Sequence, residues 1–359
     1  MAYTLGKTLQ NLPGPVLITG HTGFKGTWMT LLLQHLGIPI VGYSLKPEQD
    51  SLYDRAKLQG QIPEIYGDIR NYKKLKKFIE KHKPSVIIHM AAQPLVLESY
   101  KIPLTTFDVN VMGTANLLDL AFKAKTVKAI LVVTSDKVYR NDNLGRRYVE
   151  TDPLEGEDPY SASKVATEAA VKAWQKISEE FEGPKIVSVR AGNVIGGGDF
   201  AENRLIPDLV KSVLIKKENF VIRNPASTRP WQHVLDPLSG YILALESSLL
   251  GKSEPSYNFA PKEQSLSVRE VAESFIKLSG SKVNLIIEHS GKNLEASTLN
   301  LDVTKSNKEL NWDSFWNQTD AVAQSYSWWS KVLNQQDPIL RVCNEEIELL
   351  IQFFKNRGD

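Results

Sequence analysis

The first half of the chain alternates short, continuous apolar runs with amphipathic stretches. Continuous apolar runs are typical of strands buried on both faces, and they predict strands at 15–19, 38–43, 64–66, 86–90, 129–134 and 185–189. Helical periodicity between these runs predicts helices at 25–36, from a cap at Asn71 to His82, within 105–125 and at 160–182. Strands buried on both faces that alternate with helices predict an α/β fold, a Rossmann-type doubly wound parallel sheet.

The pattern changes after Arg190. Residues 192–199 are rich in glycine, residues 224–230 resemble a turn, and the later predicted strands are short and scattered between helices. We therefore expect a smaller, C-terminal substrate-binding lobe interleaved with the first domain. The expected first domain covers 1–190 with returns near 234–260, and the expected lobe covers 191–233 and 261–359.

Composition narrows the class of protein without naming a reaction. The 359 residues carry 43 Lys and Arg against 41 Asp and Glu, so the net charge of +2 gives no basic footprint for nucleic acid or an anionic membrane. Cys343 is the one cysteine and cannot form an internal disulfide. No apolar run is long enough to span a membrane, and the N-terminus lacks the order of a signal peptide. These features predict a cytoplasmic location.

A glycine-rich turn directly follows the first predicted strand. Gly20, Gly23 and Gly26 are spaced by three residues and open the first predicted helix. Such spacing lets backbone N–H groups reach a pyrophosphate at a helix N-terminus. An ordinary glycine-rich turn is the alternative, but the position between the first strand and the first helix favours a dinucleotide site.

The expected contacts to the adenosine half are less complete. A dinucleotide site usually has an acid at the end of its second strand, where this chain has Ser44, and Glu48 and Asp50 come only later. Local chemistry therefore leaves the choice between NAD and NADP open. Asp68 follows the third predicted strand and is placed to reach the adenine amine. The alternative is that Asp68 is an ordinary acidic residue in the turn that precedes a helix.

A second set of residues indicates alcohol oxidation. Tyr160 and Lys164 lie four residues apart, hence on one face of the predicted helix. A nearby cation can lower the pKa of a tyrosine from about 10 and so make it a useful base. Ser135 follows the strand at 129–134, and the carboxyl ends of parallel strands line the ligand crevice. Its hydroxyl can orient the alcohol that Tyr160 deprotonates.

Several motifs together resemble a known family over nearly the whole chain, the extended short-chain dehydrogenases/reductases that act on nucleotide sugars, in particular their 4,6-dehydratase branch. The matching segments are GHTGFKG at 20–26, GDI at 67–69, HMAAQP at 89–94, NVMGT at 110–114, TSDKVY at 134–139, YSASK at 160–164, RAGNVIGGGD at 190–199, RLIPD at 204–208, RPWQHV at 229–234 and YNFAP at 257–261.

The resemblance implies a catalytic set. Tyr160 would take the C4 hydroxyl proton while hydride passes from C4 to NAD, Lys164 would hold the nicotinamide ribose, and Ser135 would complete the triad. Asp136 would donate a proton to the C6 hydroxyl as it leaves. Lys137 stands where related dehydratases have a glutamate base, in agreement with the branch that acts on CDP-glucose. It would be either the C5 base, with a lowered pKa, or an electrostatic stabiliser.

The resemblance also implies binding positions. Asn193, Arg204 and Arg229 would contact the substrate diphosphate, which suits the forked guanidinium geometry, and Gln93 would border the sugar. The positions implied for NAD are Gly20, Thr22, Gly23, Phe24, Lys25, Gly26, Asp68, Ile69, Ala91, Ala92, Asn110, Thr134, Tyr160 and Lys164.

The expected activity is therefore a lyase reaction, dehydration of CDP-glucose to the 4-keto-6-deoxy sugar with recycled NAD. The alternatives are another nucleotide-sugar 4,6-dehydratase, an epimerase, or a non-catalytic cofactor-binding sensor. The resemblance further implies a homodimer or homotetramer that pairs through the helices within 105–125 and at 160–182, and a place in deoxysugar biosynthesis for lipopolysaccharide O-antigen. No metal site is expected, because the histidines lack ligand spacing. They are His21, His35, His82, His89, His233 and His289.

A cluster of tryptophans near the C-terminus falls at mixed spacing in predicted helical stretches, and it is interpreted as core or lobe packing. These residues are Trp312, Trp316, Trp328 and Trp329.

Overall fold

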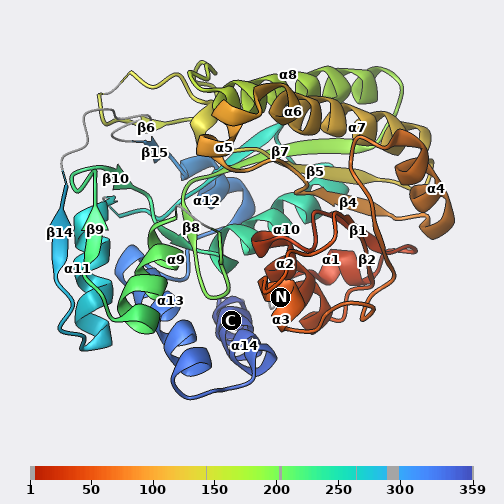
Figure 1. The fold of residues 1–359 in the computed structure, drawn as a ribbon. Coiled ribbons are helices and arrows are strands. Elements are labelled where there is room, and N and C mark those ends of the chain that lie inside the picture. The colour runs from red at the N-terminus through yellow and green to blue at the C-terminus, as the bar shows by residue number, and fades with distance from the viewer. Residues whose placement is uncertain (1–4, 143, 202–203, 264, 289–298, 358–359) are drawn as a thin grey trace.

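A seven-stranded parallel sheet organises the computed structural model of the chain (Figure 1), which describes residues 5–142, 144–201, 204–263, 265–288 and 299–357. The fold is α/β and Rossmann-type, as the sequence predicts. The strands across the sheet are, in spatial order, β12 (Ser256–Phe259), β7 (Lys185–Ala191), β5 (Ala129–Val133), β4 (Val86–His89), β1 (Val16–Thr19), β2 (Ile40–Ser44) and β3 (Glu64–Tyr66).

Helices cover both faces of this sheet. In Figure 1, α7 and α8 run along one face, while α2 and α10 lie against the other. The helices are α1 (Lys7–Gln10), α2 (Phe24–His35), α3 (Leu52–Arg55), α4 (Tyr72–His82), α5 (Val96–Lys101), α6 (Pro103–Phe107), α7 (Gly113–Lys123), α8 (Pro159–Glu180), α9 (Leu205–Leu209), α10 (Leu235–Leu249), α11 (Val268–Ser279), α12 (Thr304–Leu310), α13 (Gln318–Leu333) and α14 (Ile339–Asn356).

Alternate residues of each central strand enter different apolar cores, which explains why these strands are continuously apolar. Val16 and Ile18 of β1 belong to the larger core, with α2 and α10, whereas Leu17 belongs to the core under α4 and α7. All three side chains are at most 1% exposed. Burial on both faces explains the continuous apolar run Val16–Ile18, as is typical of parallel sheets.

The predicted elements of the first half are confirmed, with shifted ends. The predicted strand at 38–43 is Ile40–Ser44, and the predicted helix at 160–182 is Pro159–Glu180. The prediction of a helix within 105–125 is confirmed by α7, Gly113–Lys123, which is part of a longer helical segment. That segment begins earlier, as α6, and continues through a π-helical turn at Asp108–Met112 into α7. Pro103 at the first turn of α6 explains the earlier start, because proline suits the first helical position.

Short two-stranded pairs follow β7, in agreement with the predicted change of pattern. α9, α11 and α13 pack beside them (Figure 1). The strand β12 then returns to the edge of the main sheet, beside β7. The pairs are β8 (Val194–Ile195) with β11 (Gln232–His233), β9 (Phe220–Ile222) with β14 (Leu285–Ile287), β10 (Thr228–Arg229) with β13 (Leu266–Ser267), and β6 (Arg147–Tyr148) with β15 (Asn300–Leu301).

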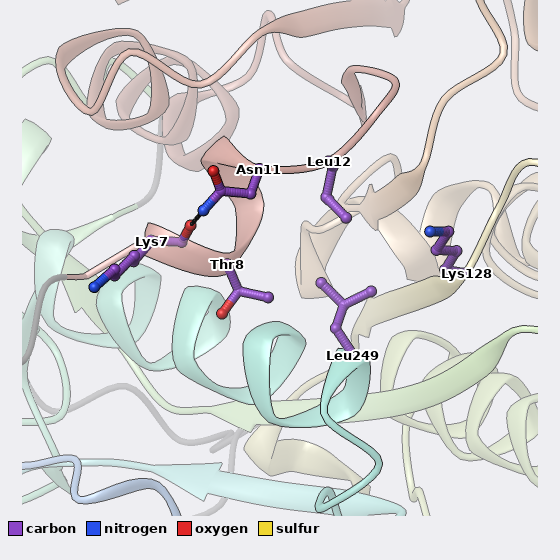
Figure 2. Close-up of a pocket in the computed structure, with 6 residues that line it drawn as sticks. All are labelled: Lys7, Thr8, Asn11, Leu12, Lys128 and Leu249. Atoms are coloured by element: carbon purple, nitrogen blue, oxygen red, sulfur yellow. Dashed lines mark hydrogen bonds between the residues drawn. The ribbon is translucent and has the colours of Figure 1, made fainter.

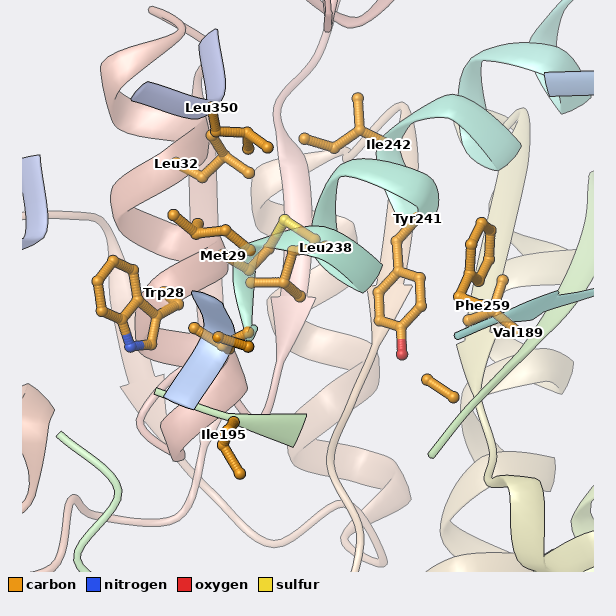
Figure 3. Packing of buried hydrophobic residues seen from close by; sticks show 14 of the residues in the cluster. Trp28, Met29, Leu32, Val189, Ile195, Leu238, Tyr241, Ile242, Phe259 and Leu350 are labelled. Atoms are coloured by element: carbon orange, nitrogen blue, oxygen red, sulfur yellow. The ribbon is translucent and has the colours of Figure 1, made fainter. Parts of the chain in front are cut away.

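The tryptophans pack in the core, as predicted. Trp312 and Trp316 lie in the segment between α12 and α13, so the prediction that they are helical is wrong. Figure 3 shows the neighbouring core, where Met29 of α2 extends towards Leu238 of α10, and Leu350 of α14 lies beside Leu32 of α2. In the described part of the chain, no helix combines the length and apolarity that crossing a membrane requires.

Candidate active site

The turn between β1 and α2 has the shape of a phosphate cradle. Gly20 adopts a φ of +76°, and a Cβ there would lie 2.8 Å from the Ala91 nitrogen. A Cβ on Gly26 would lie 2.0 Å from the Gly20 oxygen, so the turn tolerates no side chain at either position. Among the described residues no side chain caps the N-terminus of α2 at Gly23. Its first N–H groups therefore suit a pyrophosphate.

The end of β2 carries hydroxyl groups in place of an acid. The Thr22 and Ser44 hydroxyls lie 2.7 Å apart, which joins the turn to the strand. Asp68 pairs with Arg70 at 2.6 Å, and hydrogen bonds from this guanidinium hold the pKa of Asp68 below its usual value. The Asp68 carboxylate is thus ionised and already bonded, and its contact with adenine stays a prediction.

The predicted catalytic side chains lie together where β5 ends and α8 begins. Asp158 caps α8 and places Tyr160 in its first turn, while Ser135 follows β5. The Ser135 hydroxyl donates to Asp136 Oδ1 at 3.1 Å, and Ser135 lowers the pKa of the nearby Tyr160 phenol. These three side chains, with Lys25 and Lys164, are referred to below as the Asp136 cluster.

Burial controls the acidity of the hydroxyl and carboxyl groups in the Asp136 cluster. Burial raises the pKa of Tyr160 to about 12, although the Ser135 hydrogen bond works in the opposite direction. Burial also raises the pKa of Asp136, against the opposing effect of Lys137 and the Ser135 hydrogen bond. An acid with a raised pKa keeps its proton at higher pH, as a general acid requires.

Two lysines of this cluster have lowered pKa values, the buried Lys164 and the half-buried Lys25. Burial, together with the charge of Lys25, lowers the pKa of Lys164 to about 8; the Lys164 ammonium donates to the Val133 carbonyl at 3.2 Å. Burial also lowers the pKa of Lys25 to about 8, assisted by Arg204 and opposed by Asp136. The Lys25 ammonium, expected in the phosphate turn, lies 6.0 Å from the centroid of the Tyr241 ring, and its charge acts on Asp136, which the motif alone does not predict. Lys137 is half-buried beside Asp136.

The two predicted diphosphate arginines approach the same cluster from the second half of the chain. Arg204 pairs with Asp199 at 3.0 Å, and its charge lowers the pKa of Lys25 and of Tyr160. Arg229 is buried and lowers the pKa of Asp136. The close approach depends on Gly192, since a Cβ there would lie 2.8 Å from Pro230 and 3.1 Å from Asp136 Oδ2.

A second buried cluster lies behind the first and consists of Glu168, Arg190, Thr134 and Ser188. Arg190 binds both oxygens of Glu168, at 2.8 and 3.0 Å. Thr134 and Ser188 donate to the same carboxylate at 2.6 and 2.9 Å. Burial alone would raise the pKa of Glu168, but these hydrogen bonds and the Arg190 charge hold it below its usual value. Below, this set is called the Glu168 cluster.

Asn110 and Gln93 have structural contacts. Asn110, in the π-helical turn, donates to the Ser163 hydroxyl at 2.8 Å and accepts from the Gln93 N–H at 2.8 Å. The Gln93 amide bonds Leu95 and Thr106. π-helical turns often mark functional sites. Here the turn fixes the loop after β4, and the predicted ligand contacts of both residues stay predictions.

The remaining predicted positions line the same edge of the sheet. Ile69 is buried and packs closely against Gly113. A Cβ at Gly113 would lie only 2.5 Å from Ile69 Cγ2. Ala91 lies against Gly20, with Ala92 after it. Asn193 follows β7, and its carbonyl accepts from Gln232 N–H at 3.0 Å. The structure therefore brings the predicted turn, triad and arginine positions to one edge of the sheet.

Sequence reasoning missed two features of the site. Glu168 lies four residues after Lys164, so helical spacing could have placed it on the same face. Tyr241 had no such signal, because it lies in an apolar segment of α10. Its phenol is fully buried and its hydroxyl has no hydrogen-bond partner among the described residues.

Cavities elsewhere hold none of these groups. A cavity of about 430 Å³ lies between α1 and the end of α10, where Asn11 donates to the Lys7 carbonyl at 2.9 Å (Figure 2). It contains no predicted site residue. Within the described ranges, no three His, Cys, Asp or Glu side chains group as metal ligands would. His289 lies outside the described residues.

Comparison with known proteins agrees with this geometry. Residues 16–260 match the model of the NAD dependent epimerase/dehydratase family. The chain is 38% identical over 334 residues to a protein of Salmonella typhimurium named CDP-glucose 4,6-dehydratase, covering 90% of this chain and 93% of that protein.

Solved structures share the fold. The UDP-glucose 4-epimerase of Thermotoga maritima superposes with a TM-score of 0.79 at 19% identity, over 89% of this chain and 99% of that one. The dTDP-glucose 4,6-dehydratase of Bacillus anthracis, solved in complex with NAD, superposes with a TM-score of 0.74 at 24% identity, over 89% and 97%. By its matched residues and its relatives, the chain belongs to the NAD dependent epimerase/dehydratase family, and its cofactor is NAD.

Proposed function

We propose that this chain is a CDP-glucose 4,6-dehydratase, a lyase that converts CDP-glucose to CDP-4-keto-6-deoxyglucose and water. The observation that carries the proposal is Asp136 beside Ser135 and Tyr160, a buried acid with a raised pKa in contact with an oxidation triad. The 38% identity to the Salmonella protein of that name supports the same substrate.

Oxidation at C4 comes first. Bound NAD supplies the hydride acceptor at C4 and later the hydride donor at C6. Tyr160 removes the C4 hydroxyl proton, while Ser135 orients that hydroxyl. Since the pKa of Tyr160 is about 12 in the free site, its ionisation requires added positive charge. Lys164, with its ammonium held on the Val133 carbonyl, lies on the same face of α8 and supplies part of that charge.

Elimination of water follows. The 4-keto group acidifies the C5 proton, and Asp136 donates a proton to the C6 hydroxyl as it leaves. Lys137, half-buried beside Asp136, is either the base that removes the C5 proton or the cation that stabilises the enolate. Both roles are compatible with its position.

Substrate binding completes the proposal. Arg204 and Arg229 would contact the diphosphate, with Asn193 beside them and Gln93 near the sugar. The charges of both arginines act on the catalytic groups, which supports a diphosphate bound next to the reacting sugar. The proposed domain division assigns 1–190 to the cofactor and 191–233 with 261–359 to the nucleotide sugar. The 4-keto-6-deoxy product fits deoxysugar biosynthesis for surface polysaccharide.

The first experiment is a substrate panel with purified enzyme. CDP-, dTDP-, UDP- and GDP-glucose are each incubated with and without added NAD. The expected result is loss of water, detected by mass, and the alkaline ultraviolet absorbance of a 4-keto sugar from CDP-glucose. Isomerisation without water loss would identify an epimerase. No conversion of any substrate by folded protein would identify a cofactor-binding sensor.

We further propose that the protein pairs with a second copy through α5, α6 and α8. Exposed apolar side chains gather on α5, α6 and the π-helical turn, and α5 and α6 pack against α8. Leu104 alone is 82% exposed. Light scattering after size exclusion should show a dimer or tetramer, and Leu104→Arg should dissociate it. Leu349→Arg, on exposed α14, is the control. The exposed residues are Leu97, Tyr100, Leu104, Phe107 and Met112.

A further inference from the structure

The glycine-rich segment after β8 is held tightly by the helices around it. The Gly197 carbonyl accepts a hydrogen bond from the Trp28 indole of α2 at 3.0 Å. A Cβ on Gly197 would lie 1.9 Å from the Trp328 ring of α13. Gly198 has a φ of +78°, and a Cβ there would lie 2.6 Å from Leu52 of α3. The three helices therefore leave this backbone no room for a side chain and fix the position from which the chain continues.

Asp199 is the next residue, and both oxygens of its carboxylate are bonded. Oδ1 accepts from the Ala201 N–H at 3.1 Å, and Oδ2 accepts from Arg204 Nη1 at 3.0 Å. The Asp199 side chain is 5% exposed, whereas the Arg204 side chain is 36% exposed. The ion pair therefore joins a buried anion on a fixed backbone to a partly exposed cation.

The Arg204 guanidinium keeps donors for a second anion. A guanidinium has five N–H groups, and in the described part of the chain Asp199 is the one hydrogen-bond partner of Arg204. The charge of Arg204 lowers the pKa of Tyr160 and of Lys25, which indicates that it lies towards the catalytic groups. With Nη1 held by a carboxylate, the planar group has a set orientation and still offers its other nitrogens to a phosphate.

We propose that Asp199 is a positioning residue for substrate binding, which holds Arg204 in the orientation that receives the diphosphate of the nucleotide sugar. A long, partly exposed arginine without such a partner samples many rotamers, and ordering it when the substrate binds weakens the affinity. The buried Asp199 carboxylate orders the guanidinium beforehand. The inference rests on the proposed function, because that proposal places a nucleoside diphosphate beside Arg204.

Asp199 is itself an anion and repels a diphosphate, so two effects of opposite sign compete. The diphosphate would bind the Arg204 guanidinium directly and lie farther from the carboxylate, and the attraction between charges falls with distance. Orientation of the cation is therefore the larger effect. Removing the Asp199 charge should weaken the binding of a nucleoside diphosphate.

The test measures binding without turnover. Isothermal titration with CDP, at saturating NAD, gives the dissociation constant of wild type, Asp199→Asn, Arg204→Met and the double variant. Asp199→Asn removes the ion pair at nearly constant volume and should weaken CDP binding about 10-fold. Arg204→Met should weaken it at least as much. In that background Asp199→Asn should change the dissociation constant less than about 2-fold, because the cation that it orients is absent.

Steady-state kinetics separate positioning from a general loss of structure. In Asp199→Asn the KM for CDP-glucose should rise about 10-fold, while kcat stays within about 3-fold of wild type. The reason is that Arg204 remains present and its charge still acts on Tyr160. A loss of structure would instead lower kcat and the thermal unfolding temperature together.

Asp152→Asn is a matched control. The Asp152 carboxylate likewise accepts from a backbone N–H close in sequence, that of Val149 at 2.7 Å, and from an arginine, Arg146, at 2.8 Å. The substitution therefore removes the same kind of ion pair elsewhere in the fold. It should leave the dissociation constant of CDP and the KM for CDP-glucose unchanged.

Three results would overturn the inference. Additive losses in the double variant would mean that Asp199 does not act through Arg204, and tighter CDP binding by Asp199→Asn would mean that repulsion is the larger effect. Unchanged CDP binding by Arg204→Met, a substitution at a partly exposed position, would mean that the cation does not contact the diphosphate. Binding of UDP or dTDP in place of CDP would instead contradict the proposed substrate, and the same variants titrated with that nucleotide would measure the role of Asp199.

Discussion

The Glu168 cluster and the Asp136 cluster lie at the carboxyl ends of the same strands, and both hold a buried carboxylate. Around Glu168, each oxygen has donors from Arg190 and from a hydroxyl group. Around Asp136, Ser135 is the one side chain among the described residues that donates a hydrogen bond, and the nearby cations act through their charge. The pKa of Glu168 is lowered, whereas the pKa of Asp136 is raised.

The difference separates two uses of buried charge. A carboxylate whose lone pairs are all satisfied is fixed in one protonation state and one geometry, so it can hold β5, β7 and α8 together. A carboxylate with few donors can gain and lose a proton at little cost, which general acid catalysis requires. The cations of the two clusters differ in the same way. Arg190 is bonded to Glu168, whereas Lys164 and Lys25 have pKa values lowered to about 8 and can lose a proton more easily.

The largest expected effect on activity comes from a substitution in the Asp136 cluster. Asp136→Asn removes the acid for the C6 hydroxyl and should lower kcat for dehydration about 10³- to 10⁴-fold. It should not destabilise the fold above neutral pH. The raised pKa of Asp136 means that its contribution to stability is present at low pH and is lost as pH rises through the folded pKa. Product assays with thermal unfolding would check both; retained turnover would favour an epimerase.

Breaking the Glu168 cluster should instead lower the stability of the fold and leave the chemistry unchanged. Glu168→Gln leaves Arg190 without its buried partner and should lower the free energy of unfolding by about 3 kcal/mol, while the chemistry of the folded fraction is retained. Since the pKa of Glu168 is lowered, its contribution is present above its unfolded pKa and is lost as pH falls through the folded pKa. Urea unfolding at several pH values tests this. A double variant with Arg190→Met should recover part of the loss.

The sequence predicted the residues of the Asp136 cluster better than their surroundings. The motifs at 20–26, 134–139 and 160–164 follow or open regular elements, so their positions come directly from the strand–helix alternation. Lys25 was expected near phosphate, yet its ammonium lies over the ring of Tyr241 in α10, because side-chain direction depends on packing of α2 against α10. Tyr241 was missed for the same reason.

The smaller, later half was predictable only in outline. Its strands are two or three residues long, too short for a period to be detected, and they pair with partners far along the chain. Arg190 and Glu168, 22 residues apart in sequence, meet only after β7 inserts beside β5. Such contacts depend on the order of the strands in the sheet, and the periodicity of the sequence does not reveal that order.

His89 is a buried base whose hydrogen bonds, like those of Glu168, are satisfied. Both of its ring nitrogens are bonded, to Thr19 at 2.7 Å and to Thr114 at 2.9 Å. Burial, together with the charge of Lys164, lowers its pKa to about 3, so it stays neutral in the folded protein. The unfolded chain protonates it below about pH 6.5. Its contribution to stability is therefore complete above that pH and is lost as pH falls towards 3.

His89→Gln keeps side-chain hydrogen bonding but removes this titration. Between pH 6 and pH 4, wild type should lose roughly 1.4 kcal/mol of unfolding free energy per pH unit more than the variant. Urea unfolding of both proteins across that range measures the difference in slope. Parallel slopes would mean that His89 is protonated in the folded state as well. Burial also lowers the pKa of His82, which is partly exposed on α4, so His82→Gln should change the slope in the same direction but by less.

The smallest expected effect compares one lost donor in each cluster. Ser188→Ala removes the hydroxyl that donates to Glu168 at 2.9 Å, but Arg190 and Thr134 continue to bind that carboxylate. Stability should therefore fall by only about 1 kcal/mol, and kcat should stay at the wild-type value. Ser135→Ala likewise removes one hydroxyl from a buried carboxylate, yet it should change kcat far more than stability. If both variants lost stability and activity in the same proportion, the two clusters would have one common role. The distinction between a structural Glu168 cluster and a catalytic Asp136 cluster would then be wrong.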